Sequence, residues 1–272
     1  MKRKLLSAAM AAILILISLV SLVPFWFMFS MSTYKSENIF QGTPILPSDY
    51  FLENLKTIFA SNFIRSYGNS LFISLFSMLF CVVICAMVGY GMNVYNFRLK
   101  KVIRTFILLT MMVPSQIGII GYMIEMRNLN INNTLWPMVF VWLANGFGAY
   151  WMVSFIKGAL PMELVESARI DGANEIRIFC RIVIPCIRPG ILTLSLLIFL
   201  WSWNNYMIPL VFVNKQANYT IPIFVKSLAS AYRTDYGAQL AGLALATIPL
   251  LILFIFGSKS FIKGLTAGAV KG

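Results

Sequence analysis

Histidine is absent from this 272-residue chain, and acidic residues are few, with nine Asp and Glu against 22 Lys and Arg. Metal sites rely on His, Cys and clustered carboxylates, so we expect no metal site. Only 11% of the residues are charged and 59% are hydrophobic, against about 25% and roughly 45–50% in a soluble domain. So few charges cannot shield so much apolar surface from water, which excludes a soluble globular protein.

Two further absences restrict the chemistry. The four cysteines lie in an apolar stretch (Cys81, Cys85) and in a loop predicted to be cytoplasmic (Cys180, Cys186), so we expect no disulfide framework. A phosphate-binding P-loop is also absent, because residues 257–260 (GSKS) lack the upstream glycine and its spacing. We therefore expect no cofactor on this chain and no ATPase activity of its own.

Six long stretches contain no Lys, Arg, Asp or Glu, and each is 20 to 32 residues long. A membrane-spanning helix needs about 20 mostly apolar residues, whereas barrel strands alternate and last only ~10 residues. The sequence therefore predicts an all-α polytopic membrane protein, a single domain over 1–272 with six transmembrane helices. The predicted spans are approximately 5–30, 69–93, 105–125, 135–156, 189–213 and 237–258.

The distribution of basic residues predicts the orientation. With six spans and an N-terminus inside, the inner segments hold 15 Lys and Arg and the outer segments hold 7. The positive-inside rule then places both termini in the cytoplasm. The net charge of +13 reflects this bias and an affinity for anionic lipid, and it is poor evidence for nucleic acid binding.

The loop 158–188, between the fourth and fifth predicted spans, contains helix start and stop signals. Pro161 suits the first turn of a helix and Gly172 its end. Asn174 can cap a second helix, which we expect to end at Pro185. Asp171 opposes the dipole of the first helix, so we expect it to cap the next segment or to meet a cation on a partner.

The six uncharged stretches also contain no His, and Glu125 lies just past the outer end of the third, which disfavours a proton-coupled pump and leaves sodium coupling open. Their polar side chains are neutral. They can hold helices together, or they can line an aromatic pathway for a polyhydroxylated solute, and the two roles are compatible. The candidate pathway residues are Gln116, Asn145, Trp203, Asn204, Asn205 and Tyr206.

The run ESARIDGA (166–173), followed nine residues after Gly172 by IVIP (182–185), resembles the cytoplasmic EAA coupling motif of ABC importer permeases. That motif is E-A-A, three residues, G, nine residues and I-x-L-P, and this chain has Ser167 for Ala and Ile184 for Leu. The alternative is a solvated amphipathic loop. The candidate coupling residues are Glu166, Ser167, Ala168, Asp171, Gly172, Ala173, Ile182 and Pro185.

The resemblance extends to the oligosaccharide branch of these permeases, the group similar to the maltose permease G subunit. It rests on Asn69-Ser70, MVPSQ (112–116), ELVESARIDGA (163–173), WSWNNYMIPL (201–210) and FIKGLTAGAVKG (261–272). It implies a sugar permease in a bacterial or archaeal cytoplasmic membrane. It also implies a second permease chain, two cytoplasmic ATPase subunits that bind ATP and Mg, and an extracytoplasmic solute-binding protein.

The C-terminal segment 259–272 is predicted to be a cytoplasmic tail. Its glycines disfavour a helix, so it is either a solvated end or, as the resemblance implies, an element that contacts the ATPase subunits. The residues concerned are Lys263, Gly264, Gly268, Lys271 and Gly272.

Two other functions stay open. One is a permease of the same superfamily for another solute, such as glycerol phosphate, although an anionic solute would favour basic residues along the path. The other is a facilitator or secondary transporter that works without ATP. A catalytic membrane enzyme has no nucleophile–base pair or metal cluster to support it.

Overall fold

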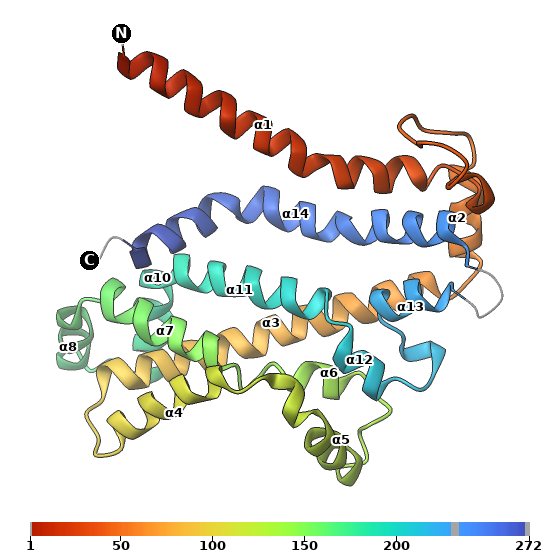
Figure 1. Cartoon of the computed structure of the whole chain (residues 1–272). Coiled ribbons are helices and arrows are strands. Elements are labelled where there is room, and N and C mark those ends of the chain that lie inside the picture. The colour runs from red at the N-terminus through yellow and green to blue at the C-terminus, as the bar shows by residue number, and fades with distance from the viewer. Residues whose placement is uncertain (1, 230–233, 270–272) are drawn as a thin grey trace. The chain divides into compact units, whose positions relative to one another are not determined.

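The computed structural model describes residues 2–229 and 234–269, and their backbone is helical with no strand among them. The chain divides into two compact units, residues 1–67 with 221–249 and residues 68–220 with 250–272. Figure 1 labels the helices along the chain. The all-α prediction is confirmed for the described residues.

The first unit contains six helices or parts of helices. They are α1 (Lys2–Met31), η1 (Ser36–Asn38), α2 (Phe51–Phe59), α3 (Phe63–Val94) as far as Tyr67, α13 (Ile221–Ser227) and α14 (Tyr236–Ala269) as far as Pro249. The Asn54 amide donates to the carbonyl oxygens of Ser32 and Tyr34 at 2.8 and 2.9 Å. Gly237 lies against Tyr34 and Asn54 so closely that a Cβ would collide with both.

The N-terminal helix α1 has an apolar sequence and buries little of it. Leu14 is 65% exposed and Leu16 is 62% exposed, and both lie in the apolar stretch Ala9–Met31. Such an exposed apolar surface is stable only against lipid or another protein. Helix α1 is therefore a membrane segment with few contacts inside its own chain.

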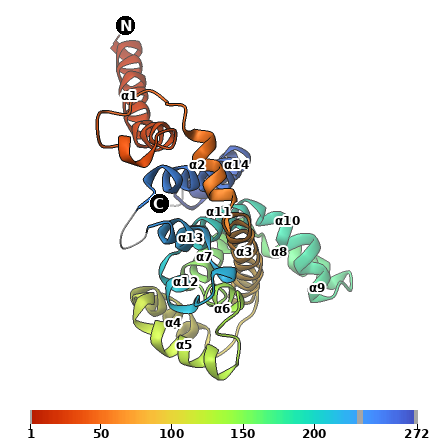
Figure 2. The same cartoon turned by 90° about the vertical axis from the view of Figure 1, so that its right-hand side faces the viewer.

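The second unit contains α14 from Leu250 on and the remaining helices. They are α3 (Phe63–Val94, from Gly68 on), α4 (Lys100–Met112), η2 (Ser115–Gly118), α5 (Ile119–Asn128), α6 (Trp136–Phe140), α7 (Gly146–Ala159), α8 (Met162–Ile170), α9 (Glu175–Ile178), the π-helical turn η3 (Phe179–Val183), α10 (Ile184–Cys186), α11 (Arg188–Trp203), α12 (Met207–Phe212) and η4 (Gln216–Asn218). Figure 2 shows α8, α9 and α10 together on one side of this unit.

Helices α3, α7 and α11 pack closely against one another in the second unit. Cys85 of α3, Met152 of α7 and Leu194 of α11 are buried in one apolar cluster. Polar bonds join the same helices, since the Asn93 amide donates to the Val153 carbonyl at 3.0 Å and the Trp151 indole donates to the Gly190 carbonyl at 3.1 Å. The coupling segment is thus attached to a well-packed base.

Three of the predicted spans are single helices that are long and apolar enough to cross a membrane. They are Ala9–Met31, Phe63–Val94 and Tyr236–Ser258. The third predicted span is instead two helices, α4 and η2–α5, bent by 92°. Pro114 explains the break, because it lacks an N–H and forces Val113 into an extended conformation (φ −83°, ψ 120°).

The fourth and fifth predicted spans are also interrupted. Asn145 is extended and separates α6 from α7, while α11 ends at Trp203, before Asn204 and α12. A second bend of 80° separates residues Glu175–Cys186 from α11. If each bent pair is one span, the described residues contain up to five spans, so the count of six stays a prediction.

Candidate functional site

The predicted coupling segment folds as a short helix, a tight turn and a second helix. Pro161 precedes α8 in an extended conformation (φ −64°, ψ 126°), and Glu163 lies in the first turn, where a carboxylate interacts favourably with the helix dipole. Both features follow from local rules. The prediction placed Pro161 one residue too far inside the helix.

Gly172 ends α8 as predicted, and its conformation explains why a glycine stands there. Its φ is +77°, a left-handed value that other residues adopt at a cost. The Gly172 N–H donates to the Arg169 carbonyl at 3.0 Å, and the Ala173 N–H donates to the Ala168 carbonyl at 2.9 Å. These two bonds form a Schellman motif, which satisfies carbonyls at the helix end.

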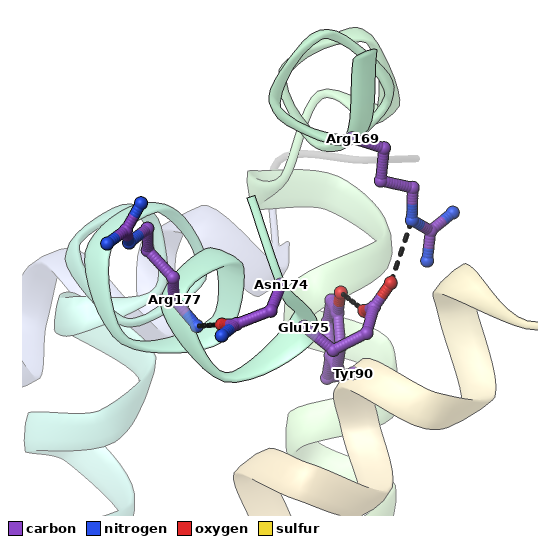
Figure 3. Close-up of polar contacts among 5 residues, drawn as sticks. All are labelled: Tyr90, Arg169, Asn174, Glu175 and Arg177. Carbon is purple, nitrogen blue, oxygen red and sulfur yellow. Dashed lines mark hydrogen bonds and ion pairs between the residues drawn. The ribbon is translucent and has the colours of Figure 1, made fainter. Parts of the chain in front are cut away.

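Asn174 caps the second helix as predicted. Its side-chain oxygen accepts a hydrogen bond of 2.9 Å from the Arg177 N–H (Figure 3), so Asn174 takes the capping role considered for Asp171. The prediction that this helix ends at Pro185 is wrong, because Pro185 lies inside α10, which continues to Cys186. A π-helical turn, in which the Ile184 N–H bonds the Phe179 carbonyl, directly precedes the proline and offers a wider turn for its ring.

The eight candidate coupling residues do not share one environment. Glu166, Ser167, Asp171, Gly172 and Pro185 are exposed, and Ala173 and Ile182 are half-buried. Ala168 is buried in the cluster that also holds Val165 and Ile178. Ala168 therefore anchors α8 to its own chain, and its place among the coupling residues stays a prediction.

Glu175 ties the coupling segment to α3, a contact that the sequence reading missed. Its carboxylate accepts a hydrogen bond of 2.6 Å from the Tyr90 hydroxyl of α3 and one of 2.9 Å from Arg169 Nε of α8 (Figure 3). The Arg169 guanidinium also lies 5.5 Å from the centre of the Tyr95 ring. One carboxylate thus joins α8, α9 and the end of α3.

The same contacts determine the charge of Glu175. Hydrogen bonds from Arg169, Tyr90 and Tyr95 lower the pKa of its carboxyl to about 2. These donors favour the ionised form, and charge-assisted bonds of this type are stronger than neutral ones. Glu175 is therefore an anion throughout the physiological range.

Exposed apolar side chains flank the turn between α8 and α9. Ile170 is 86% exposed and Ile176 is 76% exposed, although both are aliphatic. Apolar groups beside exposed Glu166 and Asp171 are typical of a protein contact surface. Two aliphatic residues beside the coupling motif indicate a contact surface, and the sequence analysis did not include them among the candidate residues.

A second candidate site is a cavity of about 730 Å³, the solute cavity, between broken helix ends of the second unit. Four of the six predicted pathway residues line it, namely Gln116, Asn204, Asn205 and Tyr206. Trp142, Trp201 and Ser115 also line it and were not in the predicted set. No charged side chain lines the cavity, so its surface consists of amides, two hydroxyls, aromatic rings, a thioether and aliphatic groups.

The other two predicted pathway residues have structural roles. Trp203 is 2% exposed and stacks on Phe199 at 5.7 Å, so it belongs to the core. The Asn145 side chain accepts a hydrogen bond of 2.7 Å from the Gly148 N–H and caps α7. Two of the six predicted residues therefore pack against or cap helices, whereas four line the cavity.

The C-terminal segment differs from the expected flexible tail. Helix α14 continues to Ala269 and includes Lys263, Gly264 and Gly268, while Lys271 and Gly272 lie outside the described residues. Extending an existing helix adds one hydrogen bond per residue, which offsets the cost of about 1 kcal/mol per glycine. The expectation of a poor helix is wrong as far as Ala269.

Long apolar helices joined by an exposed helix–turn–helix loop define a polytopic membrane protein. The chain belongs to the family of the binding-protein-dependent transport system inner membrane component, which it matches over residues 82–266. It is thus a membrane-spanning permease subunit of an ABC importer.

Among its relatives are permeases of sugar importers. The arabinooligosaccharides transport system permease protein AraQ of Halalkalibacterium halodurans is 33% identical over 228 residues, which cover 83% of this chain and 81% of the relative. The lactose transport system permease protein LacG of Rhizobium radiobacter is 30% identical over 272 residues, which cover 100% and 98% of the two chains.

The fold also has a counterpart among solved structures. A chain of a bacterial ABC transporter involved in the import of the acidic polysaccharide alginate superposes with a TM-score of 0.82 and 22% identity. The match covers 95% of this chain and 97% of that chain. At this identity the likeness establishes the fold alone.

Proposed function

We propose that this permease translocates a neutral sugar, of oligosaccharide size, across the cytoplasmic membrane of a bacterium or archaeon. It works with a second permease chain, two cytoplasmic ATPase subunits that bind ATP and Mg, and an extracytoplasmic solute-binding protein. Six spans and cytoplasmic termini complete this proposal. The observation that carries the substrate class is the uncharged solute cavity, and the names of the sugar-importer relatives support it.

The lining of the cavity suits a polyhydroxylated solute. The indole of Trp201 and the ring of Tyr206 offer flat apolar surfaces, and the amides of Gln116 and Asn204 offer donors and acceptors for hydroxyl groups. A phosphate ester would require a basic group to offset its desolvation, and none lines the cavity. These properties favour a neutral sugar over glycerol phosphate.

The coupling segment explains how ATP hydrolysis on another subunit reaches the helices. The exposed turn around Asp171 and Gly172 docks into a groove of the ATPase, and Glu175 holds this turn rigidly to α3 and α8. When the ATPase subunits close, they move the turn, and α3 moves with it. The solute cavity then changes its access from one side of the membrane to the other.

The test is transport by the complete importer in proteoliposomes. The purified complex and its binding protein are supplied with labelled neutral oligosaccharides, or with glycerol phosphate, with and without ATP inside. We expect ATP-dependent uptake of an oligosaccharide only.

Two results would contradict the proposal. Uptake of glycerol phosphate in preference to every sugar would overturn the substrate class. Uptake by the isolated chain without ATP would show that the protein is a facilitator and does not need the ATPase subunits.

A further inference from the structure

A basic pocket lies at the end of the second unit that carries the coupling segment. It has a volume of about 610 Å³ and is formed where α3 ends, α4 begins and α7 leads into α8. Five basic residues and no acidic residue line it. They are Arg98, Lys100, Lys101, Arg104 and Lys157.

The charges of the basic pocket are largely uncompensated. Lys100 Nζ donates to the Tyr95 carbonyl at 2.9 Å and to the Asn96 side-chain oxygen at 3.3 Å, both of which are neutral. Within the described residues, none of the ion pairs involves a pocket side chain. Like charges in one concave site repel each other and are stabilised when an anion enters.

Helix α4 adds to the positive potential. Its first turn contains Lys100 and Lys101 and no acidic residue, and Leu99, which precedes it, provides no side-chain cap. Cations at a helix N-terminus oppose the dipole, and uncapped N–H groups there favour an anion such as phosphate. Helix α4 therefore begins in an arrangement that a bound anion would stabilise.

Apolar surface continues from the charged pocket. One wall of the pocket is formed by the buried side chains of Met92, Val153 and Ile156. A second groove, of about 380 Å³, shares Lys101 with the pocket and runs along Val102, Phe106 and Leu109 of α4. These three residues follow one face of the helix and are 53% to 65% exposed.

We propose that the basic pocket binds the phosphate headgroup of an anionic phospholipid, with an acyl chain in the groove of α4. The basic residues meet the phosphate, and the apolar face extends into the hydrocarbon region. A free phosphate would use only the charged part, whereas a lipid accounts for both. In the proposed topology this end of the unit faces the cytoplasm, where basic pockets between spans bind acidic headgroups.

The experiment counts lipids on the purified importer complex by native mass spectrometry. The delipidated complex is exchanged into micelles containing phosphatidylglycerol or phosphatidylcholine with the same acyl chains. We expect selective retention of phosphatidylglycerol, and a loss of affinity of about tenfold in Arg98→Gln/Arg104→Gln. The matched control, Arg177→Gln/Arg181→Gln, removes two exposed charges from the coupling segment and should retain the lipid as the unaltered complex does.

Further arms separate the sources of the anion and guard against misfolding. Arg98→Lys/Arg104→Lys keeps the positive charge and should retain most of the phosphatidylglycerol. This variant tests the proposal even if the double Gln variant assembles poorly. Displacement of the lipid by millimolar glycerol 3-phosphate would overturn the lipid assignment in favour of a soluble phosphate compound. Equal retention of both lipids would also overturn it. Loss of the ATPase subunits with unchanged lipid retention would instead assign the basic pocket to a protein partner.

Discussion

The coupling segment and the solute cavity belong to the same unit and are stabilised in different ways. The segment is held by defined polar bonds, namely the Schellman motif at Gly172, the Asn174 cap and the Glu175 bridge. The cavity lies where helices are interrupted, at η2 and between α11 and α12, and has neutral walls. We propose that the first arrangement transmits force as one unit and that the second opens and closes around a solute.

The most severe change should be a bulky or reversed charge at the tip of the coupling segment. In Gly172→Arg or Asp171→Lys we expect ATP-driven uptake to fall to background, because the exposed turn no longer enters the ATPase groove. Membrane insertion should persist, since both residues are outside the core. Uptake in proteoliposomes and copurification of the ATPase subunits measure this.

Glu163→Lys is the control for that experiment, because it reverses an exposed charge on the same helix but away from the turn. It should retain most of the uptake. Normal uptake and normal association of the ATPase subunits in both Gly172→Arg and Asp171→Lys would contradict the proposed coupling role of the segment.

Alanine variants of two tryptophans on α11 should distinguish a residue that lines the cavity from one that belongs to the core. Trp201→Ala should reduce sugar uptake about tenfold, a loss of ~1.4 kcal/mol of interaction, while the ATPase subunits stay bound. Trp203→Ala should instead lower the stability of the complex by about 3–5 kcal/mol, because it removes a buried ring. Uptake and thermal unfolding are measured on both variants. Loss of stability in Trp201→Ala together with loss of uptake alone in Trp203→Ala would contradict the proposal that the solute binds in this cavity.

Breaking the Glu175 bridge should have a moderate effect with a defined pH dependence. Glu175→Gln should lower stability by about 1 kcal/mol, because the partners are partly exposed and the charge-assisted bonds are screened. The folded pKa is depressed to about 2, so the contribution is complete above the unfolded pKa and is lost as the pH falls toward 2.

The measurement is the unfolding midpoint of the complex at different pH values, for Glu175→Gln and for the unaltered chain. The difference between the two should be constant from about pH 6 to 8 and shrink below about pH 4. Tyr90→Phe, which keeps the ring and removes one bond, should show a smaller difference. A difference that grows on acidification would contradict the bridge.

The smallest effect should come from removal of residues 264–272. We expect membrane insertion to stay intact and ATP hydrolysis to fall about two- to threefold, because residues 264–269 extend α14 beyond its apolar part and can contact the ATPase subunits. ATPase rate and solute uptake with and without the segment measure it. Identical ATPase rates, and an identical ratio of solute transported to ATP hydrolysed, would show that the segment is only a solvated end of the chain.

Local chemistry made some features predictable from the sequence. Gly172 and Asn174 follow rules that involve only a few neighbouring residues, and both roles are confirmed. The Glu175 bridge was not predictable, because Tyr90 lies 85 residues away in the sequence. Pro185 misled the sequence reading, because a proline is tolerated where a wider turn precedes it.

The pathway residues show a second limit. Trp201 and Trp203 are separated by about 200° around a helix, so only one of them can face the cavity. Helix α11 is apolar on all sides, and its sequence therefore contains no polar face that identifies the inward side. Which indole lines the cavity is decided by the neighbouring helices.

The interrupted end of α11 has a consequence for how recognition by this permease can be studied. The last four carbonyl groups of a helix lack partners within it. In α11 the Leu200 and Ser202 carbonyls accept from the Asn204 and Asn205 N–H groups, whereas none of the described hydrogen bonds reaches the carbonyl of Trp201, a residue that lines the solute cavity. A sugar hydroxyl can donate to such a carbonyl whatever side chain the residue carries. Alanine scanning leaves the main chain unchanged, so it will understate the contribution of this turn to specificity, and ester replacement of single peptide bonds is the better probe.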